Sequence, residues 1–310
     1  MSQSNNNYEE QLSSKQLLSF NYVSDILEAK GMRFTEVQQR VLGVRNADNK
    51  YTNLGLWLSD ENPVTITVSE FVNGKLAQVD NTIEFKGSIL KQYFDIVEYL
   101  QSKNRSHRTF IRGMREDVWE YPKEAIEEIV ANMIIHRDYS INGSSVIKVL
   151  NDRIEFTSFG GLPLGMQFDE LFIGMSVCRN KYLANFFKHA QVATGFGLGI
   201  GKIRDSYFRS IVYPRIKVND DVFKVILPNQ EYAFTMDNDK DPVHLSLAEM
   251  SKLLGVLEQL KDKNTLAKKQ IQDALQVTTT RCMIILDFLV AKELLEVVDT
   301  DKGKVYRRPR

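Results

Sequence analysis

Residues 126–136 read IEEIVANMIIH, and this stretch decides the fold class. Its apolar residues recur at steps of three and four, as on one side of an α-helix that packs against a large partner; they are Ile126, Ile129, Val130, Met133 and Ile134. Glu128, Asn132 and His136 stand four positions apart and share another face of that helix. Taken alone, such a polar row is most often the solvated side of a helix, so its meaning depends on what surrounds it.

The segments after this helix predict a sheet beside it. Strand patterns lie at residues 146–150 and 154–157, and a glycine step at Gly160 and Gly161 ends them. The remaining predicted elements are helices at 168–173 and 182–189, a glycine-rich turn at 195–201 that leads into a helix, and strands at 212–218 and 222–227. We therefore expect an α+β sandwich over residues 104–232.

Three further regions flank this domain. Residues 1–13 are polar and predict a disordered leader. Residues 14–103 predict a small α/β module with two short helices, a strand at 64–68, a hairpin-type turn at Asn73-Gly74 and a helix capped by Ser88. Residues 243–310 predict three helices and a hairpin, which is the pattern of a winged helix-turn-helix domain.

The composition excludes several classes of protein. Lys and Arg total 40 and Asp and Glu total 40, so no global charge draws the 310-residue chain to nucleic acid or membrane. No apolar run approaches the roughly 18 residues of a membrane span, and no signal peptide pattern opens the chain, so we expect a cytoplasmic protein. Cys178 and Cys282 lie far apart without a CxxC or Cys/His cluster, which predicts reduced, structural thiols.

The glycine-rich turn GFGLGIG, Gly195–Gly201, precedes a helix. Its backbone N–H groups could cradle phosphate at the positive end of the helix dipole, although a flexible turn or close helix packing explains the glycines equally well. Two named loops are excluded by their spacing. A Walker A loop would need glycine at Phe196, and a dinucleotide GxGxxG begun at Gly195 would need glycine at Ile200.

The chain contains, in this order, the motifs Glu128–Asn132, His136–Ser140, Asp152–Phe156, Ser158–Leu162, Arg179-Asn180 and the Gly195 loop. In order and spacing they resemble the GHKL-like ATPase module of bacterial transcriptional regulators, often labelled RecG-like helicase relatives. Tyr8–Gln11 and Tyr51–Gly55 are similar to the segment that precedes this module in the family, so the resemblance covers residues 8 to about 230. An AlbA/Schlafen-type nucleic-acid-binding domain usually precedes this segment in the family and is missing here, so the chain looks like a shortened member.

The resemblance implies ATP and Mg²⁺ as ligands and assigns roles to the motif residues. Glu128 matches the residue that activates water, and Asn132 the one that holds Mg²⁺. The other implied nucleotide-binding residues are Asp138, Ser158, Gly160, Gly161, Gly195, Gly197 and Gly199. Ser158 stands where the superfamily has an aspartate that accepts the adenine amino group, which implies weakened adenine recognition and slow or absent hydrolysis.

The C-terminal region carries a local positive charge, with eleven Lys and Arg against seven Asp and Glu over residues 261–310. In a winged helix the third helix offers its first turn to the major groove while the wing contacts the DNA backbone. Candidate base contacts are Thr278, Thr279, Thr280 and Arg281, and candidate phosphate contacts are Lys302, Lys304, Arg307 and Arg308. The alternative is a winged helix that serves protein contact or dimerisation.

These patterns together predict a DNA-binding transcriptional regulator in which a degenerate nucleotide-binding module is joined to a winged helix, as a homodimer. One alternative is an active Mg²⁺-dependent ATPase that works in a nucleic-acid transaction such as repair or defence. Another is a scaffold that binds neither nucleotide nor DNA.

Overall fold

The computed structural model describes residues 8–71, 78–111, 114–163, 165–172, 177–192, 199–207, 210, 212–230, 252–253, 255–257, 259–260, 265–291, 294–301 and 303–309. The chain folds as two compact units. Unit 1 comprises Met1–Arg105, Tyr121–Ser206 and Ile216–Ile226, and unit 2 comprises Ser106–Glu120, Tyr207–Arg215 and Leu227–Arg310. Helices and strands are mixed throughout, as expected for an α+β protein.

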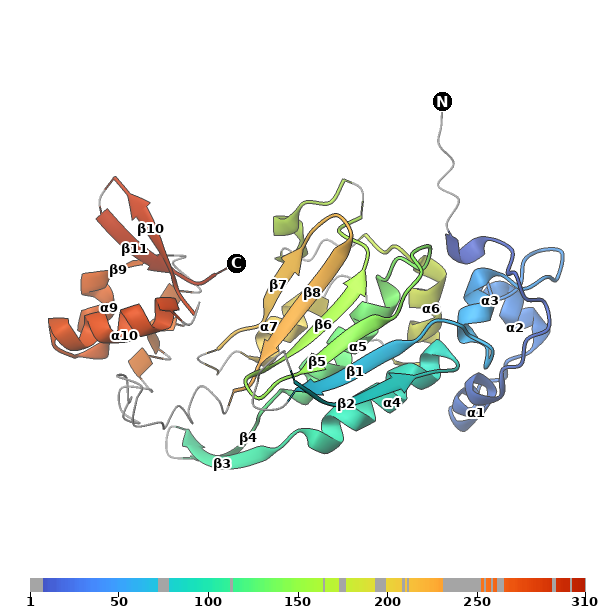
Figure 1. The fold of residues 1–310 in the computed structure, drawn as a ribbon, viewed down its shortest axis with the longest axis horizontal. Helices are drawn as coiled ribbons and strands as arrows, with labels where there is room; N and C mark the ends of the chain where they lie inside the picture. Colours follow the sequence, from blue (N-terminus) through green and yellow to red (C-terminus); the bar gives the residue numbers. More distant parts are fainter. Residues whose placement is uncertain are drawn as a thin grey trace. The chain divides into compact units, whose positions relative to one another are not determined.

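A six-stranded mixed sheet, in the order β2-β1-β5-β6-β8-β7, forms the centre of unit 1 (Figure 1). Its strands are β1 (Ile66–Phe71), β2 (Val79–Phe85), β5 (Ser145–Val149), β6 (Arg153–Phe159), β7 (Arg215–Val218) and β8 (Val222–Pro228). β1 runs antiparallel to β2 and parallel to β5, and β5 runs antiparallel to β6. The strand patterns predicted at 64–68, 146–150, 154–157 and 222–227 are confirmed.

The pairing of β1 with β5 crosses the boundary that the sequence suggested near residue 103. Ile66 lies opposite Ser145, and Glu70 lies opposite Val149, so the small N-terminal module and the following domain share one sheet. Local periodicity shows that a strand exists but not which distant strand it joins, which is why the sequence suggested two modules here.

Helix α5 (Lys123–Ile135) is the central helix of unit 1. It contacts α4 (Ile89–Lys103), α7 (Gly199–Ser206) and strand β6. Ser88 caps α4 as predicted, because its hydroxyl accepts a hydrogen bond from the Leu90 N–H. The apolar stripe of α5 is fully buried, which satisfies the predicted amphipathic helix. The predicted helix at 168–173 is a 3₁₀ turn, η3 (Phe168–Phe172).

The N-terminal helices α1 (Asn21–Ala29), α2 (Glu36–Val41) and α3 (Asn53–Leu58) precede the sheet. A 3₁₀ turn, η1 (Tyr8–Glu10), lies before them. Residues 1–13 were predicted to form a disordered leader, whereas residues 8–13 are part of the fold. Glu9 is fully buried, and its carboxylate accepts hydrogen bonds from the N–H groups of Tyr182 (2.9 Å) and Leu183 (3.0 Å). Tyr8 also stacks on Trp57, and Leu12 forms a β-bridge with Thr52. The polar composition of the segment gave no sign of these contacts, because they are made with residues far away in the chain.

Unit 2 contains two smaller sheets. One is the hairpin of β3 (Ser106–Ile111) and β4 (Met114–Trp119). The other has the order β10-β11-β9 and joins β9 (Leu266–Ala267), β10 (Glu296–Thr300) and β11 (Gly303–Arg307) beside α9 (Lys268–Leu275) and α10 (Thr279–Ala291). Buried apolar side chains connect these helices with the sheet, among them Leu266, Ile271, Leu275, Ile285, Leu286, Leu289 and Leu295.

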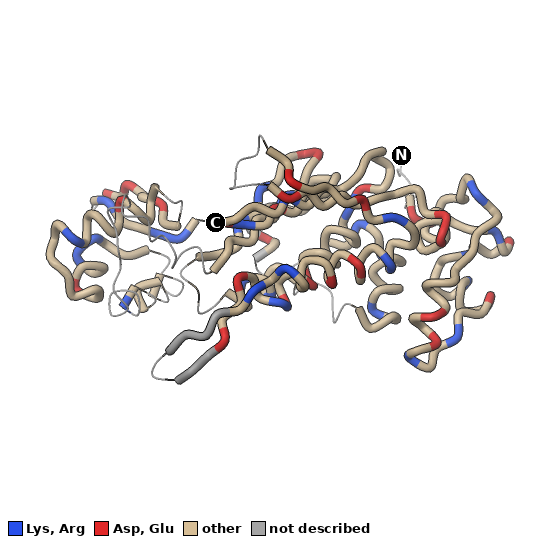
Figure 2. The backbone as a smooth tube through the Cα atoms, turned by 60° about the horizontal axis from the view of Figure 1, so that its bottom comes forward, with Lys and Arg blue, Asp and Glu red and all other residues tan. Residues whose placement is uncertain are grey.

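No single helix in the described part of the chain is both long and apolar enough to span a membrane. α9 and α10 reach that length only as a pair, with a bend of 110° between them. Lys and Arg are interspersed with Asp and Glu along the backbone of each unit (Figure 2). Cys178 and Cys282 are free thiols, as predicted. The predicted turn at Asn73-Gly74 and most of the predicted helix near 247–260 lie outside the described residues.

Candidate functional site

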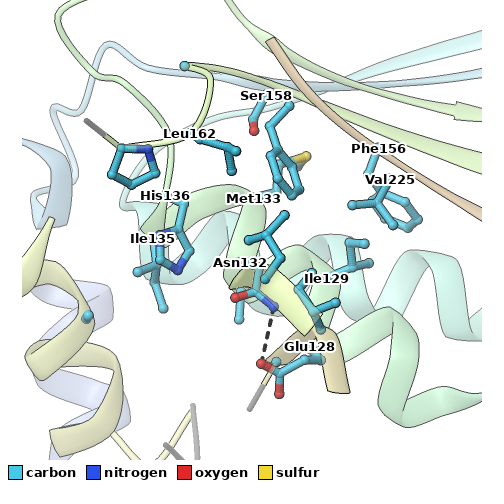
Figure 3. Close-up of a pocket in the computed structure, with 18 of the residues that line it drawn as sticks. Glu128, Ile129, Asn132, Met133, Ile135, His136, Phe156, Ser158, Leu162 and Val225 are labelled. Atoms are coloured by element: carbon cyan, nitrogen blue, oxygen red, sulfur yellow. Dashed lines mark hydrogen bonds between the residues drawn. The ribbon is translucent and has the colours of Figure 1, made fainter. Parts of the chain in front are cut away.

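The polar row of α5 faces a cavity rather than open solvent. Glu128, Asn132 and His136 all line it, and the Asn132 amide nitrogen donates a hydrogen bond to Glu128 Oε1 at 3.2 Å (Figure 3). Because this bond uses the amide N–H, the Asn132 carbonyl oxygen stays available as a ligand for a hard cation. The spacing of four residues thus brings the two groups together as the sequence predicted.

The first residue of α7, Gly199, lies directly against this pair. A Cβ atom at Gly199 would come within 2.6 Å of both Asn132 Nδ2 and Glu128 Oε1, and within 3.1 Å of Asn132 Oδ1. A side chain at this position would therefore force the ends of the Glu128 and Asn132 side chains, or the N-terminus of α7, to shift. The positive end of a helix dipole thus meets a carboxylate and an amide at one end of the cavity.

Lys202 also belongs to this group, although no sequence motif pointed to it. It lies one turn into α7, and its ammonium nitrogen is 3.5 Å from Glu128 Oε2. Lys188 of α6 (Lys181–His189) also lines the cavity. Both lysines follow from how α6 and α7 pack on α5, so no spacing within the sequence could have pointed to them.

Strands β6 and β8 form the opposite wall. Phe156 and Ser158 point to the same face of β6 because alternate residues of a strand share a face, and Phe223 and Val225 do the same on β8. The cavity has a volume of about 110 Å³, close to the roughly 150 Å³ apolar cavity that holds a benzene ring. The wall is thus mostly apolar and suits a flat ring.

Gly160 and Gly161 line the same cavity just after β6. Their backbone N–H groups donate to the carbonyl oxygens of Asp221 (2.7 Å) and Asp220 (3.1 Å). Gly161 must be glycine, because a Cβ there would lie 2.3 Å from the carbonyl oxygen of Asn219. These two glycines therefore shape the cavity through close backbone packing, and their N–H groups are already bonded within the protein.

The imidazole of His136 is buried at the C-terminal end of α5. Burial, together with the positive charge of Arg179, lowers the pKa of His136 from 6.5 to about 4. The ring is therefore neutral at pH 7. Asn180 fixes this end of the helix, because its side-chain amide donates to the carbonyl oxygens of Ile135 and Arg137, each at 2.8 Å.

Asp138, expected at the nucleotide site, is not among the residues that line this cavity. Its carboxylate pairs with Arg179 at 2.9 Å and accepts hydrogen bonds from the N–H and hydroxyl of Ser140. It lines an adjoining hollow next to η1, which shares Leu162, Pro163, Met166 and Val177 with the cavity. The chain reverses after His136, so Asp138 leaves the helical row that the first three residues share.

The DNA-binding candidates lie in unit 2 at the start of α10 and on β11. Thr278, Thr279 and Thr280 are exposed and Arg281 is half-buried, while the Thr278 hydroxyl accepts from the Arg281 N–H at 3.3 Å. Lys304 is exposed, and Gly195, Gly197 and Lys302 lie outside the described residues.

Two of the basic candidates are engaged within the protein. Arg307 pairs with Glu296 at 3.1 Å. Arg308 donates to the Leu257 carbonyl and lies over the Tyr213 ring at 3.8 Å. These two arginines therefore have structural partners, a feature that charge counting could not reveal.

No group of three or more His, Cys, Asp or Glu side chains in the described segments is placed to hold a metal ion. Mg²⁺ is usually held by one or two protein ligands together with waters and substrate phosphates, so the Asn132 carbonyl beside Glu128 fits that ion only with phosphate as a co-ligand.

The fold places this cavity in a mixed α+β domain, and a family comparison adds an ATPase-like class. Residues 143–227 match the family model described as "Putative ATP-dependent DNA helicase recG C-terminal", so the chain carries a domain similar to the RecG C-terminal ATPase module. That match begins after α5 and covers the wall formed by β6 and β8, so it does not include Glu128 or Asn132.

One solved structure similar to this chain is that of the DIP2311 protein from Corynebacterium diphtheriae, with a TM-score of 0.65 and 17% sequence identity. The alignment covers 99% of this chain and 65% of the DIP2311 chain. The likeness shows a shared fold, and this chain spans about two thirds of the length of that protein. A search of curated proteins finds no match.

Proposed function

We propose that this protein is a nucleotide-responsive DNA-binding regulator whose GHKL-like sandwich binds a purine nucleoside triphosphate in the cavity beside α5. The observation that carries the proposal is the approach of Gly199 to Glu128 and Asn132, since a Cβ at that position would collide with both side chains. The N-terminus of α7 would then bind phosphate, and the apolar end of the cavity would bind the base.

In this proposal, residues at one end of the cavity contact the base, and residues at the other end contact the phosphates and Mg²⁺. Phe156 and Val225 provide apolar surface for a planar base. The α7 N-terminus and Lys202 offer positive charge toward phosphate oxygens, and the Asn132 carbonyl offers one ligand to Mg²⁺. When bound, Mg²⁺ neutralises phosphate charge.

Calorimetric titration of the full chain with ATP and with ADP, each with Mg²⁺, tests the nucleotide site. We expect saturable binding that weakens at least tenfold in Asn132→Ala, which removes the cation ligand. Asn185→Ala is the matched control, because it removes an amide from an exposed position of α6 that does not line the cavity. Absence of binding to the wild type would overturn the proposal.

An active Mg²⁺-dependent ATPase, acting in a nucleic-acid transaction such as repair or defence, is the second candidate. It is favoured by Glu128, a carboxylate that lines the cavity beside the proposed phosphate position and could accept a proton from an attacking water. Phosphate release by the wild type that is lost in Glu128→Gln, with nucleotide affinity retained, would support it. If the wild type releases no phosphate, the ATPase function is excluded and the proposal of a nucleotide-responsive regulator remains.

DNA binding by unit 2 is proposed on α9, α10 and the β10-β11-β9 sheet, whose order along the chain is compatible with the second and third helices and the wing of a winged helix-turn-helix. The exposed first turn of α10 would contact base edges, and the exposed Lys304 would contact phosphate. Arg307 and Arg308 could join them only by leaving their partners within the protein.

Electrophoretic mobility shift at two salt concentrations tests this part of the proposal. We expect a complex at low salt that weakens as salt rises and is lost in Arg281→Ala/Lys304→Ala. Arg40→Ala/Lys50→Ala removes the same charge from exposed positions of unit 1 and should bind as the wild type does. A complex that survives the first double substitution would contradict the assigned surface.

We further propose that the regulator acts in the cytoplasm as a homodimer and that nucleotide changes its affinity for DNA. Sedimentation with and without Mg²⁺-ATP measures the oligomeric state. Mobility shifts under the same two conditions measure the coupling, and equal DNA affinities would exclude it. A chain that binds neither nucleotide nor DNA in these experiments would be a scaffold.

A further inference from the structure

Two neutral polar side chains face the apolar end of the cavity from opposite walls. Ser158 comes from β6 and His136 from the last turn of α5 (Figure 3). Ser158 as a residue is only 5% exposed, yet it lines the cavity. In the described part of the chain, neither the Ser158 hydroxyl nor the His136 imidazole has a hydrogen-bond partner.

Neither group belongs to the described polar atoms that are sealed inside the protein without a partner, so both are open to the cavity. Their position on a cavity wall suggests that a ligand supplies the missing partner. The surrounding side chains Phe156, Val225 and Leu162 are apolar and provide no competing hydrogen bonds. The polar contacts of a bound ring at this end would therefore fall to Ser158 and His136.

Both groups can serve as donor or acceptor. A hydroxyl donates one hydrogen bond and accepts others, and a neutral imidazole has one donor and one acceptor nitrogen. The imidazole is neutral because burial and Arg179 depress its pKa to about 4. The nearest charged groups on this side are the paired Asp138 and Arg179, which lie against Gly160 but do not line the cavity.

We propose that Ser158 and His136 make the base pocket permissive, so that it accepts purines with either an amino or a keto group at position 6. An acceptor-only group such as a carboxylate would favour the amino edge, whereas a hydroxyl and a neutral imidazole can rotate or change tautomer to match either edge. This inference rests on the proposed nucleotide site and names the class of base that the site accepts.

Competitive titration of the full chain with ATP and ITP, each with Mg²⁺, tests the inference, since these two nucleotides differ only at the 6-position edge of the base. We expect dissociation constants within about threefold of each other for the wild type. Ser158→Asp should favour ATP over ITP by about tenfold or more, because it introduces an acceptor-only group. Thr157→Ala, on the other face of β6, is the control and should leave the ratio unchanged.

The outcomes separate this inference from the function on which it rests. Binding of ATP by the wild type more than tenfold tighter than ITP would overturn permissive recognition and leave the nucleotide site standing. Binding of neither nucleotide would overturn both. Ser158→Ala provides a second variant if Ser158→Asp fails to fold, and it should weaken ATP and ITP by the same factor; selective loss of one nucleotide would contradict the inference.

Discussion

Gly199 is a residue at which one added carbon atom would disturb the candidate site. In Gly199→Ala the new methyl group would lie 2.6 Å from Asn132 Nδ2 and Glu128 Oε1, so the ends of these two side chains would have to leave their present positions. We expect nucleotide affinity to fall at least tenfold, about 1.4 kcal/mol or more. Calorimetric titration with Mg²⁺-ATP measures the change.

Gly201 provides a matched control two residues further along the same helix. A Cβ there meets nothing within 4 Å, and alanine favours a helix interior over glycine by about 0.5–1 kcal/mol. Gly201→Ala should therefore keep nucleotide affinity and raise thermal stability slightly. Equal loss of affinity in both variants would show that helix propensity, rather than the collision, governs binding.

His136 makes stability depend on pH. Its pKa lies near 4 in the folded protein and near 6.5 when unfolded, so the unfolded state binds the proton more tightly. The folded state is thus fully favoured above about pH 6.5 and loses free energy as pH falls toward 4. Urea unfolding across this interval should show the slope in the wild type and a reduced slope in His136→Gln, and identical slopes would contradict the assignment.

At this scale the sequence predicts contacts within one helix better than contacts between helices. The spacing of Glu128, Asn132 and His136 was sufficient to place them on one side of α5. Lys202 could not be predicted in the same way, since its contact with Glu128 depends on the packing of α7 against α5. Asp138 was assigned to the nucleotide site by the family resemblance alone, and it pairs with Arg179 outside the lining of this cavity.

Among the elements, α6 depends on a residue far away in the chain. Its N-cap residue, Asn180, makes no side-chain cap, and Glu9 supplies both hydrogen bonds to the first N–H groups instead. Glu9→Ala would leave these buried donors unpaired, at a cost of about 1–3 kcal/mol. Thermal unfolding should show a lower midpoint.

The neighbouring Glu10 is exposed and serves as the control. Glu10→Ala should change the free energy of unfolding by no more than about 0.5 kcal/mol, because exposed substitutions away from special contacts are nearly neutral. A comparable loss in both variants would mean that net charge near η1, rather than the cap on α6, stabilises this region.

Elements defined by local signals were predicted well. The cap at Ser88 and the alternating pattern of β6 are legible in a few consecutive residues. The partner of β1 was not predictable, because a strand pattern carries no information about which distant strand completes its hydrogen bonds. The 3₁₀ turn η3 was also missed, since its apolar spacing matches that of a short α-helix.

In the whole molecule, each unit contains one of the chain's two tryptophans. Trp57 is 3% exposed in unit 1 and stacks on Tyr139 with ring centroids 3.9 Å apart, and Trp119 belongs to unit 2. In Trp119→Phe, fluorescence therefore follows the unfolding of unit 1 alone. Mg²⁺-ATP at 100 times its dissociation constant should stabilise unit 1 by about 2.7 kcal/mol. The midpoint of its thermal unfolding should then rise by about 5–10 °C.

Calorimetry of the same variant observes both units. We expect the transition of unit 2 to stay at its ligand-free temperature, because the proposed cavity is lined entirely by residues of unit 1. Two transitions that rise together would show that the units unfold as one cooperative body, contrary to this prediction.

The parallel register between β1 and β5 also matters while the protein is being made. The ribosome synthesises β1 and β2 well before β5 (Ser145–Val149). Until β5 is made, one edge of β1 exposes unpaired N–H and C=O groups to any neighbouring nascent chain. A gene fragment starting at residue 104 would expose the matching edge of β5 permanently. A recombinant fragment should therefore contain both residues 66–85 and β5, because β1 and β5 cover each other's edges although they lie far apart in the sequence.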